Sequence, residues 1–412
     1  MSIRIVALAI AAAGGVAPPA AQSQEPMFAD QRGGQDVFGH YEVVADWPKP
    51  LASVPGHEGW TWGAGQSVFA ESPNRVFVLQ RGELPVIARP PTQRLRELGP
   101  SIAFPVFRLP IRDATVASPP GGGAAGTMPA DGLKAWEEAG GELGVDARWE
   151  HCILVFDADG NLVEDWSQWD SMLARPHAVY ISPYDPDRHV WIVDDYRHAI
   201  FKFSNDGREL VQTIGTYGEY GADETHFFRP TFMAWLPDGS FFVADGYENT
   251  RVVKFDANGK YLTAWGEKGS PPNETRPGYF NNVHGIAVDP QTRRVFVNDR
   301  QNHRVQIFDE NGRYLDQWRF GDSPSDIHMF IITADRHLWA ADRGTNKILK
   351  YDLDGRFLYS WGTWGDFPGG MWGVHGMSVD QDGNFYIAEV DNGGVQKFRP
   401  RPNANPAFLV GQ

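Results

Sequence analysis

Apolar and polar residues alternate along the segment from Val283 to Trp318 in four short runs. The runs read GIAVD, RRVFVND, RVQIF and RYLDQW, and Asn311-Gly312 lies between the last two. Alternation with a period of two is typical of a strand that buries one face, and Asn-Gly is typical of a tight hairpin. The pattern therefore predicts a four-stranded antiparallel meander.

The same meander recurs along the chain in six copies. Five copies carry a turn signal between their last two strands: DADG (157–160), NDG (205–207), ANG (257–259), ENG (310–312) and DLDG (352–355). The second strands read VFVLQ, VWIVD, FFVAD, VFVND, LWAAD and FYIAE, and the copies from the second onward lie roughly 43 to 54 residues apart, the range of propeller blades. The sequence predicts an all-β fold, a six-bladed β-propeller of four-stranded blades over residues 41–400.

The sixth copy, from Val374 to Arg399, has three clear strands and lacks a fourth. The segment YEVVADW at 41–47 matches the fourth strands of the other copies, LVEDW, YLTAW and YLDQW. We expect it to complete the last blade, because closing the ring in this way removes exposed sheet edges. The segment AFLVGQ, within a C-terminal tail at 401–412, is the rival for this role.

Two segments depart from the repeat. Residues 1–23 carry Arg4, an apolar Ala-rich run and a small-residue ending, which predicts a signal peptide and an exported protein, periplasmic or secreted. No other run approaches the roughly 18 apolar residues of a membrane span. An insertion at about 82–149 contains ASPPGGGAAGTMPADG. It either covers one end of the ring or forms a solvated excursion.

Net charge and composition exclude some classes of binding partner and some covalent features. The formal net charge of −15 argues against nucleic acid and anionic membranes. The single cysteine, Cys152, excludes an intramolecular disulfide, and its apolar context (HCILVFD) predicts a buried, inert thiol. The 15 Trp and 25 Phe residues suit the faces between packed sheets.

Histidines recur at the start of the innermost strand. Aligned on the residue that ends strand two, the six positions are Gly65, His177, Thr231, His284, His328 and His375. Blades two, four and six lie a third of a turn apart, so His177, His284 and His375 would converge on the axis. Three neutral imidazoles with an open fourth position are a catalytic zinc arrangement. A single such histidine more often lines a wet channel, and His328 is interpreted as channel-lining or substrate-contacting.

A second set of equivalent positions, occupied by arginines and tyrosines, follows the end of the second strand. Arg81, Arg300 and Arg343 stand one step beyond it, and Tyr196 and Tyr247 stand one step further. The aspartates that end the second strands are expected to tie blades together through backbone hydrogen bonds. Arginines on the same face as the histidines would supply fixed positive charge for a substrate carboxylate or an oxyanion.

These residues together resemble a known family. The chain is similar to the lyase domain of peptidylglycine alpha-amidating monooxygenase, a peptidyl-alpha-hydroxyglycine alpha-amidating lyase built from NHL-type repeats as a six-bladed propeller. The segments that carry the resemblance are DWP (46–48), VLQRG (78–82), RPHAV (175–179), ADGYENTRVVKF (244–255), YLTAWGE (261–267), VHGIAV (283–288), VNDRQNHRVQIF (297–308) and VHGMSVD (374–380). The resemblance implies that His177, His284 and His375 are zinc ligands. It also implies that Arg81, Tyr247 and Arg300 are catalytic.

The chain departs from this family in three ways. The family places an aspartate after its third zinc histidine, where it holds a structural calcium, and here that position is Gly376. Calcium is therefore a candidate with an incomplete ligand set, which retains only the carbonyls of Val68 and Val179. The family's disulfide cysteines are missing, and Glu248 follows Tyr247 where one would stand. The copper hydroxylase of the fused animal enzyme is missing too, so a separate hydroxylase would supply the substrate.

The resemblance implies a lyase reaction. Zinc would polarise the hydroxyl of a carbinolamide that carries a carboxylate, and Tyr247 would remove the hydroxyl proton. The C–N bond would break to give an amide and glyoxylate or a related aldehyde, with Arg81 and Arg300 stabilising the developing charge. Two other classes stay open: a metal-dependent hydrolase of esters or lactones, and a non-catalytic NHL propeller that binds proteins or glycans.

Overall fold

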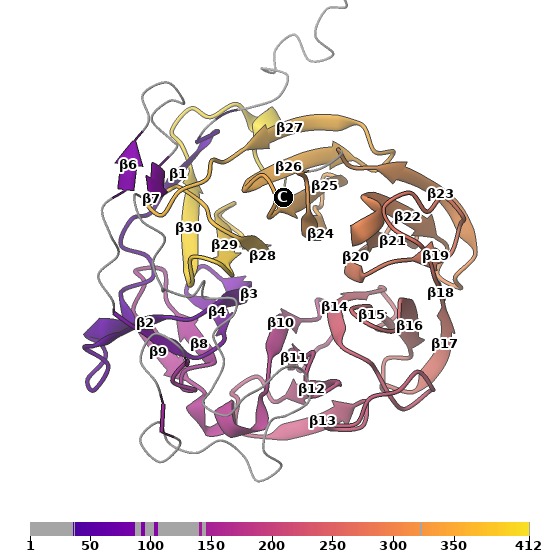
Figure 1. The fold of residues 1–412 in the computed structure, drawn as a ribbon, viewed down its shortest axis with the longest axis horizontal. Coiled ribbons are helices and arrows are strands. Elements are labelled where there is room, and N and C mark those ends of the chain that lie inside the picture. The colour runs from indigo at the N-terminus through magenta and orange to yellow at the C-terminus, as the bar shows by residue number, and fades with distance from the viewer. Residues whose placement is uncertain are drawn as a thin grey trace, which may run out of the picture.

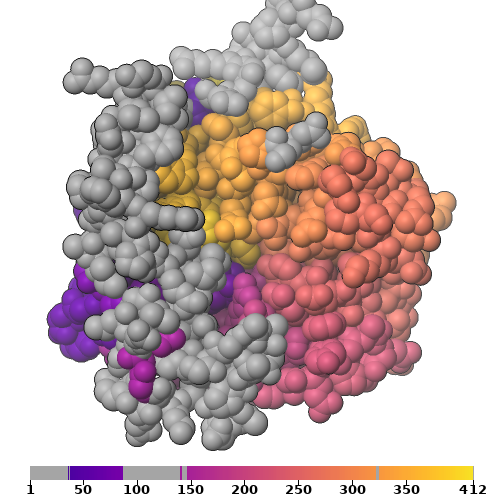
Figure 2. Space-filling model, viewed as in Figure 1, coloured from indigo at the N-terminus to yellow at the C-terminus, as the bar shows by residue number. Residues whose placement is uncertain are grey.

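Six four-stranded antiparallel sheets surround a central axis, with strands β3, β10, β14, β20, β24 and β28 innermost (Figure 1). The computed structural model describes residues 36, 38–86, 140–141, 146–321 and 324–411, and the backbone alone of 92–94 and 103–105. The prediction of an all-β, six-bladed propeller is confirmed. In the space-filling view, the blades from β14 to β27 pack side by side as one continuous surface (Figure 2).

Each blade runs outward from the axis in chain order. Blade one contains β3 (Gly65–Ser72), β4 (Arg75–Gln80), β8 (Ile153–Phe156) and β9 (Leu162–Asp165). Blade two contains β10 (Pro176–Ile181), β11 (Val190–Asp194), β12 (Ala199–Phe203) and β13 (Leu210–Ile214). Blade three contains β14 (Pro230–Trp235), β15 (Phe241–Asp245), β16 (Arg251–Phe255) and β17 (Tyr261–Trp265).

The other three blades repeat this order. Blade four contains β20 (Val283–Asp289), β21 (Arg294–Asp299), β22 (Arg304–Phe308) and β23 (Tyr314–Arg319). Blade five contains β24 (Ile327–Ile332), β25 (His337–Asp342), β26 (Lys347–Asp352) and β27 (Phe357–Trp361). Blade six contains β28 (Val374–Val379), β29 (Phe385–Glu389), β30 (Val395–Pro400) and the N-terminal β1 (Tyr41–Val43).

The N-terminal strand closes the ring. β1 pairs antiparallel with β30, with Tyr41 opposite Pro400 and Val43 opposite Phe398. This is the closure that the YEVVADW pattern predicts, over the first three of its residues. The rival AFLVGQ forms no strand, because its start belongs to a short 3-10 helix, η6 (Pro406–Phe408). This C-terminal segment instead buries Phe408 in the core, and the backbone N–H of Val410 donates to the Tyr41 hydroxyl at 2.9 Å.

The residue that ends each second strand fixes the connection from the preceding blade. Each side chain accepts a hydrogen bond from a backbone N–H shortly before the innermost strand. The donor and acceptor pairs are Gly63 to Gln80, Ala174 to Asp194, Phe228 to Asp245, Asn281 to Asp299, Asp326 to Asp342 and Trp372 to Glu389. The aspartates therefore form the expected backbone hydrogen bonds, but each bond joins the aspartate to the segment that enters its own blade and not to a neighbouring blade. As a result, the loops that carry Arg175 and Arg229 are anchored to their own blades.

Aromatic side chains fill the space between blades. The rings of Trp191 and Trp235 lie 5.9 Å apart across blades two and three, and those of Trp339 and Phe385 lie 5.3 Å apart across blades five and six. Each such ring buries on the order of 150–250 Å² of surface. Cys152 is fully buried beside this core, and burial raises the pKa of its thiol well above the usual value, as expected of an inert thiol.

Short strand pairs and 3-10 turns lie outside the six four-stranded blades. β2 (Trp60–Trp62) pairs with β5 (Glu83–Pro85), β6 (Thr92–Arg94) with β7 (Ala103–Pro105), and β18 (Glu267–Lys268) with β19 (Tyr279–Phe280). The remaining 3-10 turns are η1 (Leu51–Ser53), η4 (Ser167–Met172) and η5 (Arg300–Asn302). Most of the insertion at 82–149 and the whole of 1–23 lie outside the described residues. The part of the chain that the structure describes contains no helix long and apolar enough to cross a membrane.

Candidate metal centre and its arginine rim

A β-bulge opens the innermost strand of every blade. The pairing between the first and second strands slips by one residue near the start, as between Pro176 and Ala178. A bulge of this kind re-aims one side chain. The six bulge residues are Gln66, His177, Thr231, His284, His328 and His375. The prediction of Gly65 for blade one was wrong, because Gly65 pairs with Gln80. The loop between the first two strands varies in length, so counting from strand two misplaces this position by one residue.

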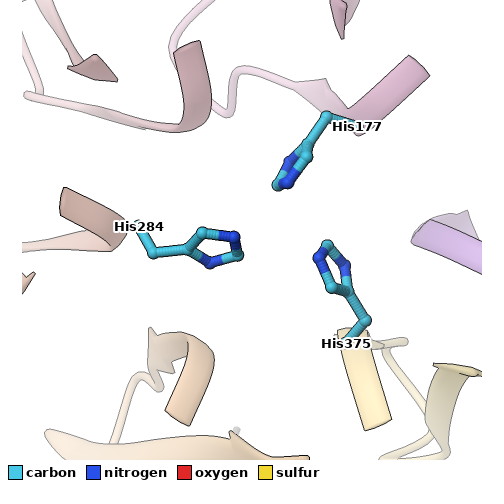
Figure 3. A group of neighbouring side chains, drawn as sticks. All are labelled: His177, His284 and His375. Carbon is cyan, nitrogen blue, oxygen red and sulfur yellow. The ribbon is translucent and has the colours of Figure 1, made fainter. Parts of the chain in front are cut away.

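The bulges of blades two, four and six bring three histidines together on the axis. Figure 3 shows the rings of His177, His284 and His375 pointing toward one another from three sides. One ring nitrogen from each lies within 4.8 Å of the other two. His177 and His284 are fully buried, and His375 is 3% exposed. The convergence expected from alternate-blade spacing is therefore present.

The bulge residues of the odd blades hold these rings in one orientation. Each Nδ1 faces a backbone carbonyl: His177 that of Thr231 at 3.0 Å, His284 that of His328 at 2.6 Å, and His375 that of Gln66 at 2.7 Å. A carbonyl only accepts hydrogen bonds, so each Nδ1 carries the proton. Burial lowers the pKa of all three imidazoles well below the usual value, which keeps them neutral. Each Nε2 therefore directs a lone pair at the axis, as metal-binding histidines do.

Tyr247 completes this centre from blade three. Its hydroxyl lies 3.1 Å from Nε2 of His177 and 2.8 Å from Nε2 of His284. The hydroxyl has one proton and faces two lone pairs, so only one of these contacts can be a hydrogen bond. A cation among the three nitrogens and the hydroxyl oxygen would satisfy every lone pair, and three neutral imidazoles are a donor set that suits zinc. The residues therefore fit the expected metal.

A close approach of two blades positions Tyr247. Gly246, the residue before it, lies so near blade four that an added Cβ would be 1.7 Å from the Val283 carbonyl oxygen. Any side chain at position 246 would clash with the backbone of blade four. The tyrosine reaches the axis because its neighbour has no side chain.

Phe232 is a residue of the centre that sequence reasoning missed. Its ring centroid lies 4.9 Å from that of His177, 5.2 Å from His284 and 5.6 Å from His375. One side of the histidine triad is therefore closed by a buried apolar ring. The sequence signal was its place directly after the bulge residue Thr231, but the chain has many phenylalanines and nothing else marked this one.

The predicted arginines differ in how they are held. Nε and Nη2 of Arg300 each lie 2.7 Å from an oxygen of Asp326, and Arg343 grips Asp391 in the same way at 2.9 and 2.6 Å. Arg81 has no such partner among the described residues. The nearest carboxylate oxygen, Oδ1 of Asp195, is 3.8 Å away. Burial, together with the charge of Arg175, lowers the pKa of Arg81 to about 9.

Asp195 joins Arg81 to two arginines that sequence reasoning missed. Its Oδ2 accepts from Nε and Nη2 of Arg229 at 3.0 and 2.7 Å, and its Oδ1 lies 3.6 Å from Nε of Arg175. The guanidinium of Arg229 also stacks on the ring of Tyr247, 4.3 Å from its centroid. The available signal was an Arg-Pro pair before the first strand of blades two and three, RPHAV and RPTFM.

His328, the fourth histidine of the axis, belongs to the Arg300 side. Its Nε2 lies 3.2 Å from Oδ2 of Asp326, the partner of Arg300, and its carbonyl accepts from His284. Its Nδ1 is buried without a hydrogen-bond partner. Burial and the charge of Arg300 lower its pKa to about 3, so the ring is neutral.

Another buried cluster lies at the root of the insertion. Glu83 accepts from Nδ1 of His57 at 2.8 Å and from Nδ1 of His151 at 2.7 Å, and Nε2 of His151 lies 3.2 Å from Asp165. Its three ligand-type atoms also stand close enough to hold a metal. The distances are those of hydrogen bonds, so we describe this cluster as a clamp between β5 and blade one.

Comparison with known proteins agrees with the propeller fold. A family model described as "6-bladed beta-propeller" matches residues 280–363. Human NHL repeat-containing protein 3 is 31% identical over 284 residues, which cover 62% of this chain and 75% of that protein. Peptidyl-alpha-hydroxyglycine alpha-amidating lyase 1 of Drosophila melanogaster is 28% identical over 281 residues, 63% of this chain and 51% of that protein. The chain belongs to the NHL-repeat propeller family that includes the amidating lyases.

The relatives in the amidating-lyase family are longer than the region they share with this chain. Peptidyl-glycine alpha-amidating monooxygenase A of Xenopus laevis is 28% identical over 273 residues, 63% of this chain and 28% of that protein. The chain thus spans less than a third of this monooxygenase and about half of the Drosophila lyase.

The calcium position expected from the amidating-lyase family has no room for a carboxylate. A Cβ added to Gly376 would lie 2.8 Å from the carbonyl oxygen of Gln66 and 2.8 Å from Cα of Ser67. The backbone of blade six passes so close to blade one that no side chain fits at this position. The ligand set for calcium is therefore incomplete by necessity.

Proposed function

We propose that the protein is an exported zinc-dependent lyase that cleaves the C–N bond of a carbinolamide, an α-hydroxyglycine-type compound with a free carboxylate. The observation that carries the proposal is the orientation of His177, His284 and His375. Three backbone carbonyls fix the Nδ1 protons, and three Nε2 lone pairs meet beside the Tyr247 hydroxyl. The relatives named amidating lyases support the same reaction class.

Zinc held by the three histidines would supply a Lewis acid that makes the substrate hydroxyl more acidic. The Tyr247 oxygen lies where it can accept that proton, because it already contacts two of the Nε2 atoms. The electrons of the O–H bond then form the carbonyl of the aldehyde, and those of the C–N bond leave with the nitrogen. The proton returns from Tyr247 to the nitrogen, so the products are a primary amide and glyoxylate.

The surrounding side chains serve this reaction in different ways. Phe232 closes one side of the triad and keeps water from it. Arg229 stacks on the Tyr247 ring and so holds that ring in place beside the triad. Arg81 is buried without a close carboxylate partner among the described residues, so its charge is available to a developing oxyanion.

The test is product analysis on α-hydroxyhippurate. We expect wild-type protein to release glyoxylate and benzamide in equal amounts, chelation to abolish release, and added zinc to restore it. A separate hydroxylase would make such substrates in the cell. Zinc-dependent cleavage of an ester or lactone without any glyoxylate release would overturn the lyase proposal in favour of a hydrolase. A protein that binds no metal would be a non-catalytic propeller.

A further inference from the structure

Three arginines share one buried carboxylate on the blade-one to blade-three side of the centre. We call Arg81, Arg175, Arg229 and Asp195 the Asp195 cluster. The side chain of Asp195 is fully buried, and its Oδ1 accepts no hydrogen bond. The side chains of Arg81, Arg175 and Arg229 are 3%, 26% and 14% exposed, so the cluster is largely removed from water.

The charges of this cluster do not balance. One further carboxylate among the described residues lies within 4 Å of a guanidinium nitrogen of the cluster: Oε1 of Glu248 is 3.7 Å from Nη1 of Arg229, and its side chain is 46% exposed. The neighbouring Asp194 is also buried, but the hydrogen bonds that it accepts come from backbone N–H groups. Three guanidinium groups therefore face one buried carboxylate and one exposed carboxylate at longer range. Desolvated positive charge in excess is costly unless an anion joins it.

Several donors of the cluster also lack good acceptors. Nε of Arg175 is buried without a hydrogen-bond partner, and Nε of Arg81 reaches only the Pro176 carbonyl at 3.4 Å. By contrast, Nη1 of Arg175 donates a hydrogen bond to the hydroxyl of Tyr196 at 2.5 Å, and this bond holds the Arg175 side chain in place. The cluster therefore has donor capacity left for a planar anion.

The cluster lies within reach of the proposed reaction. The Arg229 guanidinium stands 4.3 Å from the centroid of the Tyr247 ring, whose hydroxyl touches the histidine triad. In an α-hydroxyglycine the hydroxyl and the carboxylate are attached to the same carbon. A substrate with its hydroxyl at the triad therefore carries its carboxylate only a few atoms away.

We propose that the Asp195 cluster is the subsite that binds the substrate's carboxylate, with Arg175 and Arg229 as the specificity-determining residues. The inference rests on the proposed function, because it assigns a partner to one group of that substrate. Asp195 holds the three guanidinium groups together against their mutual repulsion. Arg300 has a carboxylate of its own in Asp326, whereas Arg229 shares Asp195 with two other arginines, so Arg300 is not the carboxylate site.

The test uses N-acetylglycine, which has the carboxylate and amide of the substrate and no hydroxyl to react. Binding to zinc-loaded protein is measured by calorimetry, with neutral N-acetylglycinamide as the matched ligand. We expect Arg229→Gln and Arg175→Gln each to weaken N-acetylglycine binding by on the order of tenfold or more, with no such effect on the amide. Arg175→Gln is the safer variant for folding, since this side chain is the most exposed of the three.

The double variant Arg343→Gln/Asp391→Asn is the control, because it removes a balanced pair from the same face. It should bind N-acetylglycine within about twofold of wild type. Arginine variants that melt like wild type and bind N-acetylglycine equally well would overturn the subsite, as would wild-type protein that does not bind it. A failure of the proposed function looks different: N-acetylglycine binding depends on the arginines, yet no glyoxylate is released.

Discussion

The two sides of the metal centre hold their arginines in opposite ways. On the side of blades four to six, Arg300 and Arg343 each grip an aspartate of their own with two hydrogen bonds. On the side of blades one to three, Arg81, Arg175 and Arg229 share Asp195. Arg81, Arg300 and Arg343 occupy the same register of the repeat. Nevertheless, paired aspartates neutralise the charges of Arg300 and Arg343, whereas the charge of Arg81 has no close carboxylate partner among the described residues.

On the side of blades four to six, the paired arginine Arg300 is connected to the histidine triad. Burial opposes ionisation of Asp326, but hydrogen bonds from Arg300 and His328 hold its pKa far below the usual range. The carbonyl of His328 in turn accepts from Nδ1 of His284. Arg300 thus acts through Asp326 and His328 on the orientation of a histidine. Under the proposed function, Arg300 would be a positioning residue rather than the catalytic residue that the resemblance implies, and the Asp195 cluster would meet the substrate.

The largest expected effect comes from the tyrosine between the two sides. Tyr247→Phe should retain zinc and lower kcat by about a hundredfold or more, because the proton acceptor is gone. The measurement is kcat on α-hydroxyhippurate together with metal content. Tyr196 is the control, since its hydroxyl accepts from Arg175 and is not among the groups on the triad. Tyr196→Phe should raise KM and leave kcat nearly unchanged; a variant of Tyr247 with full turnover would contradict this assignment.

Removing one arginine from each side sharpens the comparison. Arg300→Gln leaves Asp326 without its partner, so we expect a loss of about 1–3 kcal/mol in the free energy of unfolding and a lower kcat with little change in KM. Arg229→Gln should mainly raise KM, because Arg175 and Arg81 still face Asp195. Denaturant unfolding and steady-state kinetics separate the two outcomes.

The double variant Arg300→Gln/Asp326→Asn tests the reason for the stability loss. It removes the unpaired charge, so most of the lost stability should return. If Arg300→Gln instead raised KM like Arg229→Gln and cost no stability, the distinction between the two sides would be wrong.

The smallest expected effect concerns the clamp at the root of the insertion. Burial opposes the charged form of His151, but hydrogen bonds to Asp165 and Glu83 raise its pKa to about 10. A raised pKa in the folded state means that the charged form stabilises the fold. This stabilisation is complete below about pH 6.5, the usual histidine pKa, and is lost as the pH rises toward 10. His151→Gln should therefore lower the melting temperature at pH 6.5 more than at pH 10; an equal loss at both would contradict the clamp.

The repeated parts of this molecule were predictable from sequence. Alternation and turn signals placed the blades, and alternate-blade spacing brought His177, His284 and His375 together, because a ring converts equal spacing into convergence. The expected strand at 41–47 pairs over residues 41–43. The position of the β-bulge was harder to predict from sequence. In blade one the bulge residue is Gln66, one position after the predicted Gly65.

The parts that depend on contacts between neighbouring blades were not predictable. Asp195 comes from blade two and Arg229 from the loop before blade three, and they meet only because the blades pack side by side. Nothing in one repeat distinguishes Arg300, whose charge is neutralised, from Arg81, whose charge is not. That difference depends on Asp326, which stands 26 positions from Arg300 in the sequence.

Metal analysis of purified protein tests the central claim most directly. The account predicts about one zinc per chain after mild purification, a sharp reduction in His284→Ala, and none bound in a folded triple variant with alanine at His177, His284 and His375. Stoichiometric zinc persisting in that triple variant would contradict the site, and would direct attention to the cluster of His57, Glu83 and His151 instead.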